Sequence, residues 1–87
     1  MVTSVERAVI VTGAGKGLGA AFALAIAGDG AAVLVNNRLR DGQSDSAAAI
    51  ASQITAQGGR AATDYHDIAS PGAAEALVHA AITAFGR

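Results

Sequence analysis

The fold is decided by residues 12–19, which read Thr-Gly-Ala-Gly-Lys-Gly-Leu-Gly. They follow the apolar run Ala-Val-Ile-Val at residues 8–11, which predicts a strand buried on both faces of a parallel sheet. A stretch rich in Ala and Leu continues to about Asp29, and Gly30 is a natural point for a helix to end. Residues 12–19 are therefore expected to form a Gly-rich turn between a strand and a helix.

A second unit of the same kind follows the first. Its strand is predicted at residues 32–35, Ala-Val-Leu-Val, and a polar loop separates this strand from the next helix. Either Ser44 or Asp45 is expected to cap that helix, because both side chains accept hydrogen bonds from free N–H groups of a first turn. The helix is expected to run to Gln57, where two glycines end it.

A third unit completes the chain and begins with the weakest strand. That strand is predicted at residues 60–65, and Asp64 interrupts its apolar character. The helix after it is expected to have Ser70 as its N-cap and Pro71 at its first position, where the missing N–H of proline costs nothing. Gly86 is expected to end this helix.

The order of the elements predicts an α/β fold. Strands that alternate with helices form a parallel sheet joined by right-handed crossovers. We expect one domain over residues 1–87, with the three strands in the order 3-2-1. The first helix is expected on one face of the sheet, and the second and third helices are expected to cross it.

The composition excludes several classes of protein. With 52% hydrophobic and 15% charged residues, the 87-residue chain is not of the disordered type. A net charge of −1 and 3% aromatic residues argue against nucleic acid or a membrane as a partner. The absence of Cys excludes disulfides and thiolate metal sites. Neither a membrane span nor a signal peptide is recognisable, so we expect a cytoplasmic protein.

A Gly-rich turn between a strand and a helix is suited to binding phosphate. Glycine permits the turn and lets the backbone approach a pyrophosphate, while the first N–H groups of the helix and its dipole attract the negative charge. The spacing here is T-G-x-x-x-G-x-G and not G-x-G-x-x-G. A P-loop fits less well, because Gly17 stands where a Ser or Thr would bind magnesium. A tight turn without any ligand is the simpler alternative.

Residues 12–19 closely resemble the cofactor signature of the short-chain dehydrogenase/reductase family. The likeness extends to residues 30–38 as the second strand, 64–68 as the end of the third strand and 84–87 as the end of the third helix. The resemblance implies a Rossmann-type doubly wound sheet and an oxidoreductase that moves hydride between NADP(H) and a carbonyl or alcohol. It implies the following cofactor-binding residues: Gly13, Gly15, Lys16, Gly17, Leu18, Gly19, Asn37, Arg38, Asp67 and Ile68.

The family's catalytic residues are absent from the chain. Its Asn-Asn-Ala-Gly motif, its Ser and its Tyr-x-x-x-Lys pair are missing, since Asn36-Asn37 is followed by Arg38 and Tyr65 has Ala69 four residues later. We expect the chain to be the amino-terminal, cofactor-binding half of a longer enzyme, cut before the fourth strand and inactive alone. The intact enzyme is expected to form a homo-oligomer. A stand-alone, non-catalytic module for nucleotide binding or subunit association is the alternative.

The choice between the two nicotinamide cofactors depends on the end of the second strand. An acidic residue there binds the ribose hydroxyls of NAD and repels the extra phosphate of NADP. The residue in this place is the neutral Asn37, and Arg38 offers a guanidinium to a phosphate. Lys16 adds a second positive charge. The residues therefore favour NADP over NAD, although solvated surface charges are the simpler interpretation of both.

Several other polar residues are given no catalytic role. His66 and His79 lie on different elements without a third ligand, so no metal site is expected. Asp67 is interpreted, from the resemblance, as a residue at the edge of the adenine ring, followed by Ile68. Asp64 is expected to be structural, and Thr12 is expected to brace the turn.

Overall fold

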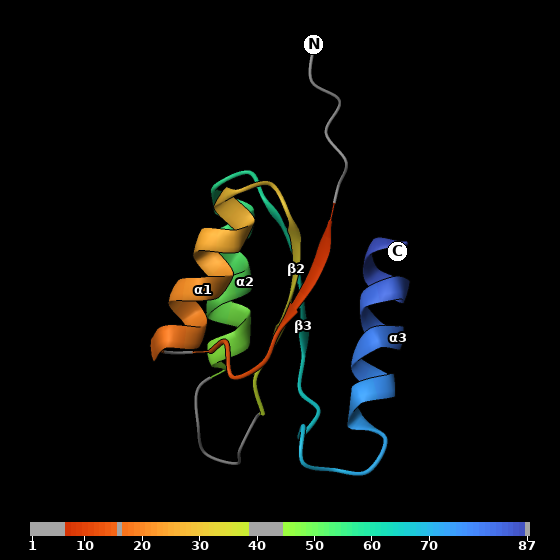
Figure 1. Cartoon of the computed structure of the whole chain (residues 1–87). Helices are drawn as coiled ribbons and strands as arrows, with labels where there is room; N and C mark the ends of the chain where they lie inside the picture. The colour runs from red at the N-terminus through yellow and green to blue at the C-terminus, as the bar shows by residue number, and fades with distance from the viewer. Residues whose placement is uncertain (1–6, 16, 39–44, 87) are drawn as a thin grey trace.

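The computed structural model describes residues 7–15, 17–38 and 45–86. Lys16 and Ser44, which carry two of the predictions above, lie outside the described residues. The strands and helices alternate along the chain as predicted (Figure 1). In order they are β1 (Ala8–Val11), α1 (Gly17–Gly28), β2 (Ala32–Asn36), α2 (Ser46–Ala56), β3 (Arg60–Asp64) and α3 (Ala73–Phe85).

The three strands form one parallel sheet in the order β1-β2-β3, which confirms the predicted order. Ala32 at the start of β2 pairs with Ala8 on one side and with Arg60 on the other. All five residues of the central strand β2 are buried. This burial explains why β2 is apolar at consecutive positions up to its last residue, Asn36.

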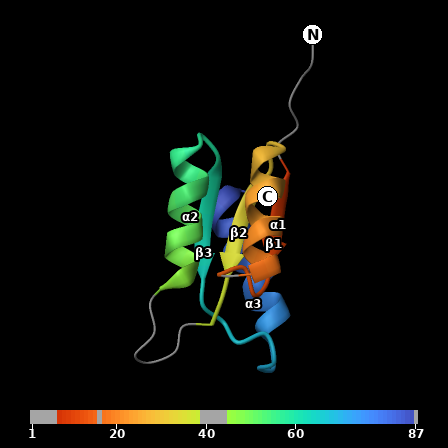
Figure 2. The same ribbon diagram turned by 90° about the vertical axis from the view of Figure 1, so that its left-hand side faces the viewer.

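The helices lie on the two faces in a different arrangement from the predicted one. Helices α1 and α2 pack side by side on one face, and α3 alone covers the other (Figures 1 and 2). The right-handed rule explains this difference. The crossovers through α1 and α2 move in the same direction along the sheet, so both helices must lie on the same face. By the same rule, a helix on the opposite face, such as α3, belongs to a crossover that moves along the sheet in the other direction.

Each face of the sheet has its own hydrophobic core. Val33 and Val35 of β2 face α1 and α2, whereas Leu34 faces α3, as the two-residue period of a strand requires. Small side chains such as Ala23 and Ala47 let the first two helices approach the strands closely. The core under α3 is smaller, with Leu34, Leu77 and Ala81 as its buried members.

The ends of the helices confirm most of the predicted stops. Asp45 caps α2, because its carboxylate accepts a 2.9 Å hydrogen bond from the backbone N–H of Ala48. Gly86 ends α3 with φ +74°, and its N–H donates to the carbonyl of Ile82. The strands differ slightly from the prediction, since β2 extends to Asn36 and β3 ends one residue before Tyr65.

The predicted start of α3 is wrong by two residues. The helix begins at Ala73, and its N-cap is Gly72, whose φ of +79° excludes it from the helix. Ser70 and Pro71 lie in consecutive turns, because the N–H of Ser70 donates to the carbonyl of Asp67 and the N–H of Ala73 donates to that of Ser70. The turns use the backbone groups that a helix starting at Pro71 would need.

Candidate nucleotide site at the carboxyl edge of the sheet

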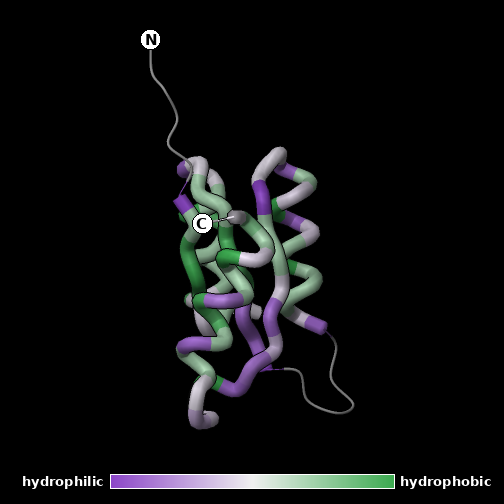
Figure 3. Tube along the Cα trace, turned by 90° about the vertical axis from the view of Figure 1, so that its right-hand side faces the viewer, coloured by the Kyte–Doolittle hydropathy of each residue, from purple (hydrophilic) through white to green (hydrophobic). Residues whose placement is uncertain are grey.

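Parallel strands end at the same edge of their sheet, which we call the carboxyl edge. It comprises the turn at residues 12–19 after β1, residues 36–38 at the end of β2 and residues 64–68 at the end of β3. Figure 3 shows several hydrophilic segments of the chain at this end of the sheet. Open α/β sheets bind their ligands outside the carboxyl ends of the strands. The predicted site residues that the structure describes therefore lie around one edge.

The Gly-rich turn is open at two glycines. Gly13 and Gly17 have φ values of +62° and +61°, a conformation that other residues adopt only with strain. Both are exposed, and apart from the adjacent backbone no described atom lies within 4 Å of the position that a Cβ would take. Gly17 begins α1, so the first N–H groups of that helix lack partners within it and can bind an anion.

The other two glycines of the turn are needed for packing within the protein. A Cβ on Gly19 would lie 2.2 Å from the carbonyl oxygen of Gly13, which leaves no room for a side chain. A Cβ on Gly15 would lie 2.5 Å from the Asn37 amide nitrogen and 2.6 Å from the Ser46 Cβ. Gly15 is buried, so the Asn37 side chain and the start of α2 rest on the turn.

A buried network joins the ends of β2 and β3. The Asn36 amide nitrogen donates to the Asp64 carboxylate at 2.8 Å and to the His66 carbonyl at 3.1 Å. The same carboxylate accepts the His66 N–H at 2.9 Å, and its other oxygen lies 2.7 Å from His66 Nδ1. The turn joins this network, because the N–H of Ala14 donates to the Asn36 carbonyl at 2.9 Å.

The network sets the charge state of Asp64. Burial by itself raises the pKa of the Asp64 carboxyl, but hydrogen bonds from His66 and Asn36, together with the charge of His66, outweigh it. The pKa of Asp64 therefore lies below its ordinary value, and the buried side chain is an acceptor for its neighbours. This confirms that Asp64 is structural, and it adds Asn36, for which the sequence predicted no role.

An ion pair connects two predicted cofactor residues. Arg38 Nη1 lies 2.9 Å from Asp67 Oδ2, and about four-tenths of each side chain is exposed. The second carboxylate oxygen of Asp67 accepts the N–H of Ala69 at 3.0 Å, which holds the chain in a turn. Ile68, which follows Asp67, and Leu18, in the first turn of α1, are both mostly exposed. The sequence analysis assigned Arg38 and Asp67 to the cofactor separately and did not predict the ion pair between them.

Tyr65 fixes the end of β3 to the start of α2. Its hydroxyl donates a 2.6 Å hydrogen bond to the carboxylate of Asp45, the residue that caps α2. This bond is the main reason that the pKa of Asp45 is lowered and that the pKa of Tyr65 is raised. The bond thus keeps the first turn of α2 beside the carboxyl edge.

Comparison with known proteins now identifies the fold family. The family model of short chain dehydrogenases matches residues 7–87. The chain belongs to the short-chain dehydrogenase family. An uncharacterized oxidoreductase of Methylorubrum extorquens is 44% identical over 81 residues, which are 93% of this chain and 32% of that protein.

Solved structures of short-chain dehydrogenases share the fold. One from Mycobacterium avium has a TM-score of 0.84 at 41% identity and is matched over 92% of this chain and 30% of the other. A 7α-hydroxysteroid dehydrogenase, solved in complex with NADH and 7-oxo glycochenodeoxycholic acid, has a TM-score of 0.83 at 33% identity. That match covers 93% of this chain and 30% of the other. The chain therefore spans just under a third of the length of these relatives.

The carboxyl edge of this short-chain dehydrogenase chain fits a nicotinamide dinucleotide, the cofactor that the family implies. Open space over the backbone of Gly13 and Gly17 leaves room for a pyrophosphate at the start of α1. The Arg38 guanidinium beyond β2 has the chemistry to bind a phosphate on the ribose. The Asp67 carboxylate beyond β3 can accept a hydrogen bond from an adenine amino group.

The described part of the chain offers no better site elsewhere. Among these residues, no group of three or more metal-ligating side chains is placed to hold an ion. His79 lies on the outer face of α3 beside Val78 and Ile82, on the face of the sheet opposite α1. No helix of the described residues is long and apolar enough to cross a membrane.

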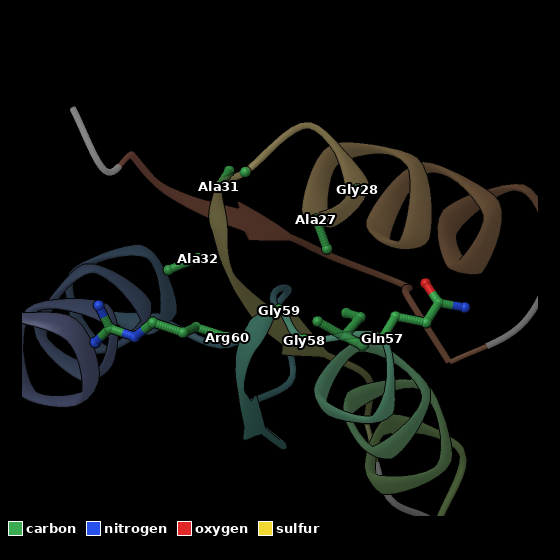
Figure 4. Close-up of a pocket in the computed structure, with 10 residues that line it drawn as sticks. Ala27, Gly28, Ala31, Ala32, Gln57, Gly58, Gly59 and Arg60 are labelled. Carbon is green, nitrogen blue, oxygen red and sulfur yellow. The ribbon is translucent and has the colours of Figure 1, made fainter. Parts of the chain in front are cut away.

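A cavity of about 460 Å³ lies at the opposite, amino edge of the sheet, where β2 and β3 begin (Figure 4). Residues 27–32 and 57–60 form this edge, and Ala and Gly dominate the lining. Arg60 extends toward α3, where its guanidinium carbon lies 5.5 Å from the centre of the Phe85 ring. The cavity has no acidic side chain in its lining and lacks the convergent polar groups of the carboxyl edge.

Proposed function

We propose that the protein is an oxidoreductase that transfers hydride between NADP(H) and a carbonyl or alcohol substrate. In this proposal the carboxyl edge binds the adenine, the ribose and the pyrophosphate of the cofactor. One observation carries the proposal: the glycine turn at the start of α1, the Arg38 guanidinium and the Asp67 carboxylate all lie at the ends of adjacent parallel strands. The bound cofactor would supply the hydride from its nicotinamide ring.

Each proposed binding residue has a physical role. The N–H groups at the start of α1, from Gly17 to Gly19, bind the pyrophosphate, and Gly13 keeps the backbone close to it. Leu18 and Ile68 present exposed apolar side chains to the two ends of the adenosine portion. Asp67 binds the edge of the adenine ring. Gly15 acts indirectly, because its missing side chain lets Asn37 lie over the turn.

The preference for NADP comes from charge at the end of β2. Asn37 is neutral, so it does not repel a 2′-phosphate as an acidic residue would. Arg38 follows directly and is exposed enough to donate to a phosphate oxygen. Lys16, which lies outside the described residues, is proposed as a second cation at the same phosphate.

The proposal places the chain in a larger enzyme. We propose that residues 1–87 supply the cofactor-binding half, and that a Ser and a Tyr–Lys pair elsewhere in the protein complete the catalytic site. The alternative is a stand-alone nucleotide-binding or subunit-association module. The intact mass of the protein in its source organism separates the two, since roughly three times 8.5 kDa supports the enzyme. We also propose that the protein is a homo-oligomer and that it is located in the cytoplasm. Sedimentation checks the oligomeric state, and cell fractionation checks the location.

Calorimetric titration tests the proposal directly. The protein, in the form that its own gene encodes, is titrated with NADPH and with NADH. We expect both to bind, NADPH more tightly, and Gly17→Ala to abolish binding of both because a methyl group would occupy the space of the pyrophosphate. Gly28→Ala serves as the control, since it adds the same methyl group in open space at the far end of α1. Unaltered affinity in a folded Gly17→Ala variant would contradict the proposed site.

A further inference from the structure

The ion pair between Arg38 and Asp67 joins two residues to which the proposed function gives separate roles. Arg38 follows β2 and is proposed to bind the 2′-phosphate, whereas Asp67 follows β3 and is proposed to bind adenine. Arg38 Nη1 donates to Asp67 Oδ2 at 2.9 Å, across the gap between the two strand ends. A carboxylate therefore stands beside the cation that a 2′-phosphate would approach.

We propose that Asp67 is a specificity-determining residue that moderates the preference for NADP by neutralising Arg38. This inference rests on the proposed function, because it concerns the same cofactor at the same edge. The Arg38 guanidinium is a cation. With the Asp67 carboxylate bonded to it, the pair as a whole carries no net charge, so a 2′-phosphate meets a weaker field than Arg38 alone would provide.

The size of the effect follows from electrostatics in an exposed setting. The 2′-phosphate, a phosphate monoester, carries roughly −1.5 to −2 charges near neutral pH. Because Arg38 Nη1 is bonded to the Asp67 carboxylate, a 2′-phosphate has to compete with that carboxylate for a charge-assisted hydrogen bond. Removing the charge of Asp67 is therefore expected to raise NADP affinity about three- to tenfold relative to NAD affinity.

The ratio of the two affinities isolates this effect from the other tasks of Asp67. Adenine is the same in both cofactors, so any lost contact between residue 67 and adenine changes both affinities equally and leaves the ratio unchanged. Asp67→Asn also keeps an oxygen that can accept the N–H of Ala69, a bond of 3.0 Å that holds the turn before α3. The variant thus changes the charge and preserves the local fold.

The experiment measures binding and not activity. The protein as its gene encodes it, its Asp67→Asn variant and its Arg38→Ala variant are titrated calorimetrically with NADPH and NADH, and then with 2′,5′-ADP and 5′-AMP. We expect the ratio for each ligand pair to rise about three- to tenfold in Asp67→Asn and to fall back toward the wild-type ratio at high salt. The control Asp29→Asn removes a carboxylate that lies 3.8 Å from Arg7 near the other end of α1, and is expected to leave both ratios unchanged.

A second comparison shows whether Asp67 acts through Arg38. In the Arg38→Ala background, Asp67→Asn is expected to raise the ratio less than it does in the wild-type background, because the cation that the carboxylate occupies is gone and only its direct repulsion of the phosphate remains. An equal rise in that background, or an unchanged or lowered ratio in Asp67→Asn alone, overturns the inference and leaves the proposed function intact. Failure of all four ligands to bind the wild-type protein overturns both.

Discussion

The two edges of the sheet differ in what they offer a ligand. The cavity of about 460 Å³ at the amino edge is lined mostly by Ala and Gly, and the Arg60 guanidinium in that lining lies over the Phe85 ring. At the carboxyl edge the buried Asn36 and Asp64 are hydrogen-bonded, and the exposed Arg38 and Asp67 form an ion pair. The carboxyl edge also has a hollow, of about 390 Å³ beside residues 63–66, so the presence of a cavity does not distinguish the two edges. Converging backbone N–H groups and charges mark the candidate site in this fold.

Substitution of glycine is expected to have the largest effect, and its direction differs between the edges. Gly19→Ala puts a Cβ 2.2 Å from the Gly13 carbonyl oxygen, so the turn must shift. We expect loss of detectable cofactor binding and about 3 kcal/mol of lost stability. Gly28→Ala meets open space at the end of α1 and is expected to leave binding unchanged and to stabilise by up to about 1 kcal/mol. Calorimetry measures the affinity and urea unfolding measures the stability of each variant. Similar losses in Gly19→Ala and Gly28→Ala would contradict the expected difference between the two edges.

The buried network supplies the second contrast, this time in stability. Asp64→Ala removes the acceptor of the His66 N–H and one of the two acceptors of the Asn36 amide, which is expected to cost about 2 kcal/mol. Asp29→Ala removes an exposed carboxylate that lies 3.8 Å from Arg7, and is expected to change stability by less than about 0.5 kcal/mol. Urea unfolding of the three proteins gives the two differences. Equal costs would mean that Asp64 does not hold the ends of β2 and β3 together.

Substitution of Arg38 at the carboxyl edge and of Arg60 at the amino edge tests which edge discriminates NADPH from NADH. Arg38→Ala is expected to weaken NADPH binding by about one to two decades and to leave NADH binding nearly unchanged, because a charge-assisted contact to phosphate is worth about 1.5–3 kcal/mol. Arg60→Ala removes the cation that lines the cavity at the amino edge, and is expected to alter neither affinity. If Arg38→Ala weakens both cofactors equally, its assignment to the 2′-phosphate is wrong.

The pH dependence of stability gives the smallest expected effect. The pKa of Asp64 is lowered in the folded protein, so this carboxylate stabilises the fold at pH values above the ordinary Asp pKa of about 3.9. That contribution is expected to disappear as the pH falls from about 4 through the lowered pKa. Unfolding of wild type and Asp64→Asn between pH 7 and pH 2 checks it, and we expect a shallower acid decline in the variant. A steeper decline would reverse the assigned direction.

Local sequence signals predicted most of the fold. The glycine turn, the apolar run of β2 and the caps at Asp45 and Gly86 depend on residues close in the chain, and all of these appear in the structure. The strand order followed from the alternation of strands and helices. The start of α3 was missed, because the helical pattern continues back through Pro71 while the positive φ of Gly72 interrupts it.

The contacts within the candidate site could not be predicted in the same way. The bond from Asn36 to Asp64 depends on the register of β2 against β3, which pairs these two residues directly. The ion pair of Arg38 with Asp67 likewise bridges two strand ends that are far apart in the chain. Residue types alone indicated a charged edge, but only the three-dimensional arrangement shows which charges meet.

Hydrogen–deuterium exchange with and without NADPH tests the central claim most directly, because it reports on both edges of one sheet in one experiment. The protein as its gene encodes it is compared with itself under saturating NADPH. We predict slower amide exchange in residues 12–19, 36–38 and 64–68, and unchanged exchange in residues 27–32 and 57–60. Protection confined to the amino edge, or no protection at the carboxyl edge under saturating cofactor, would contradict the account.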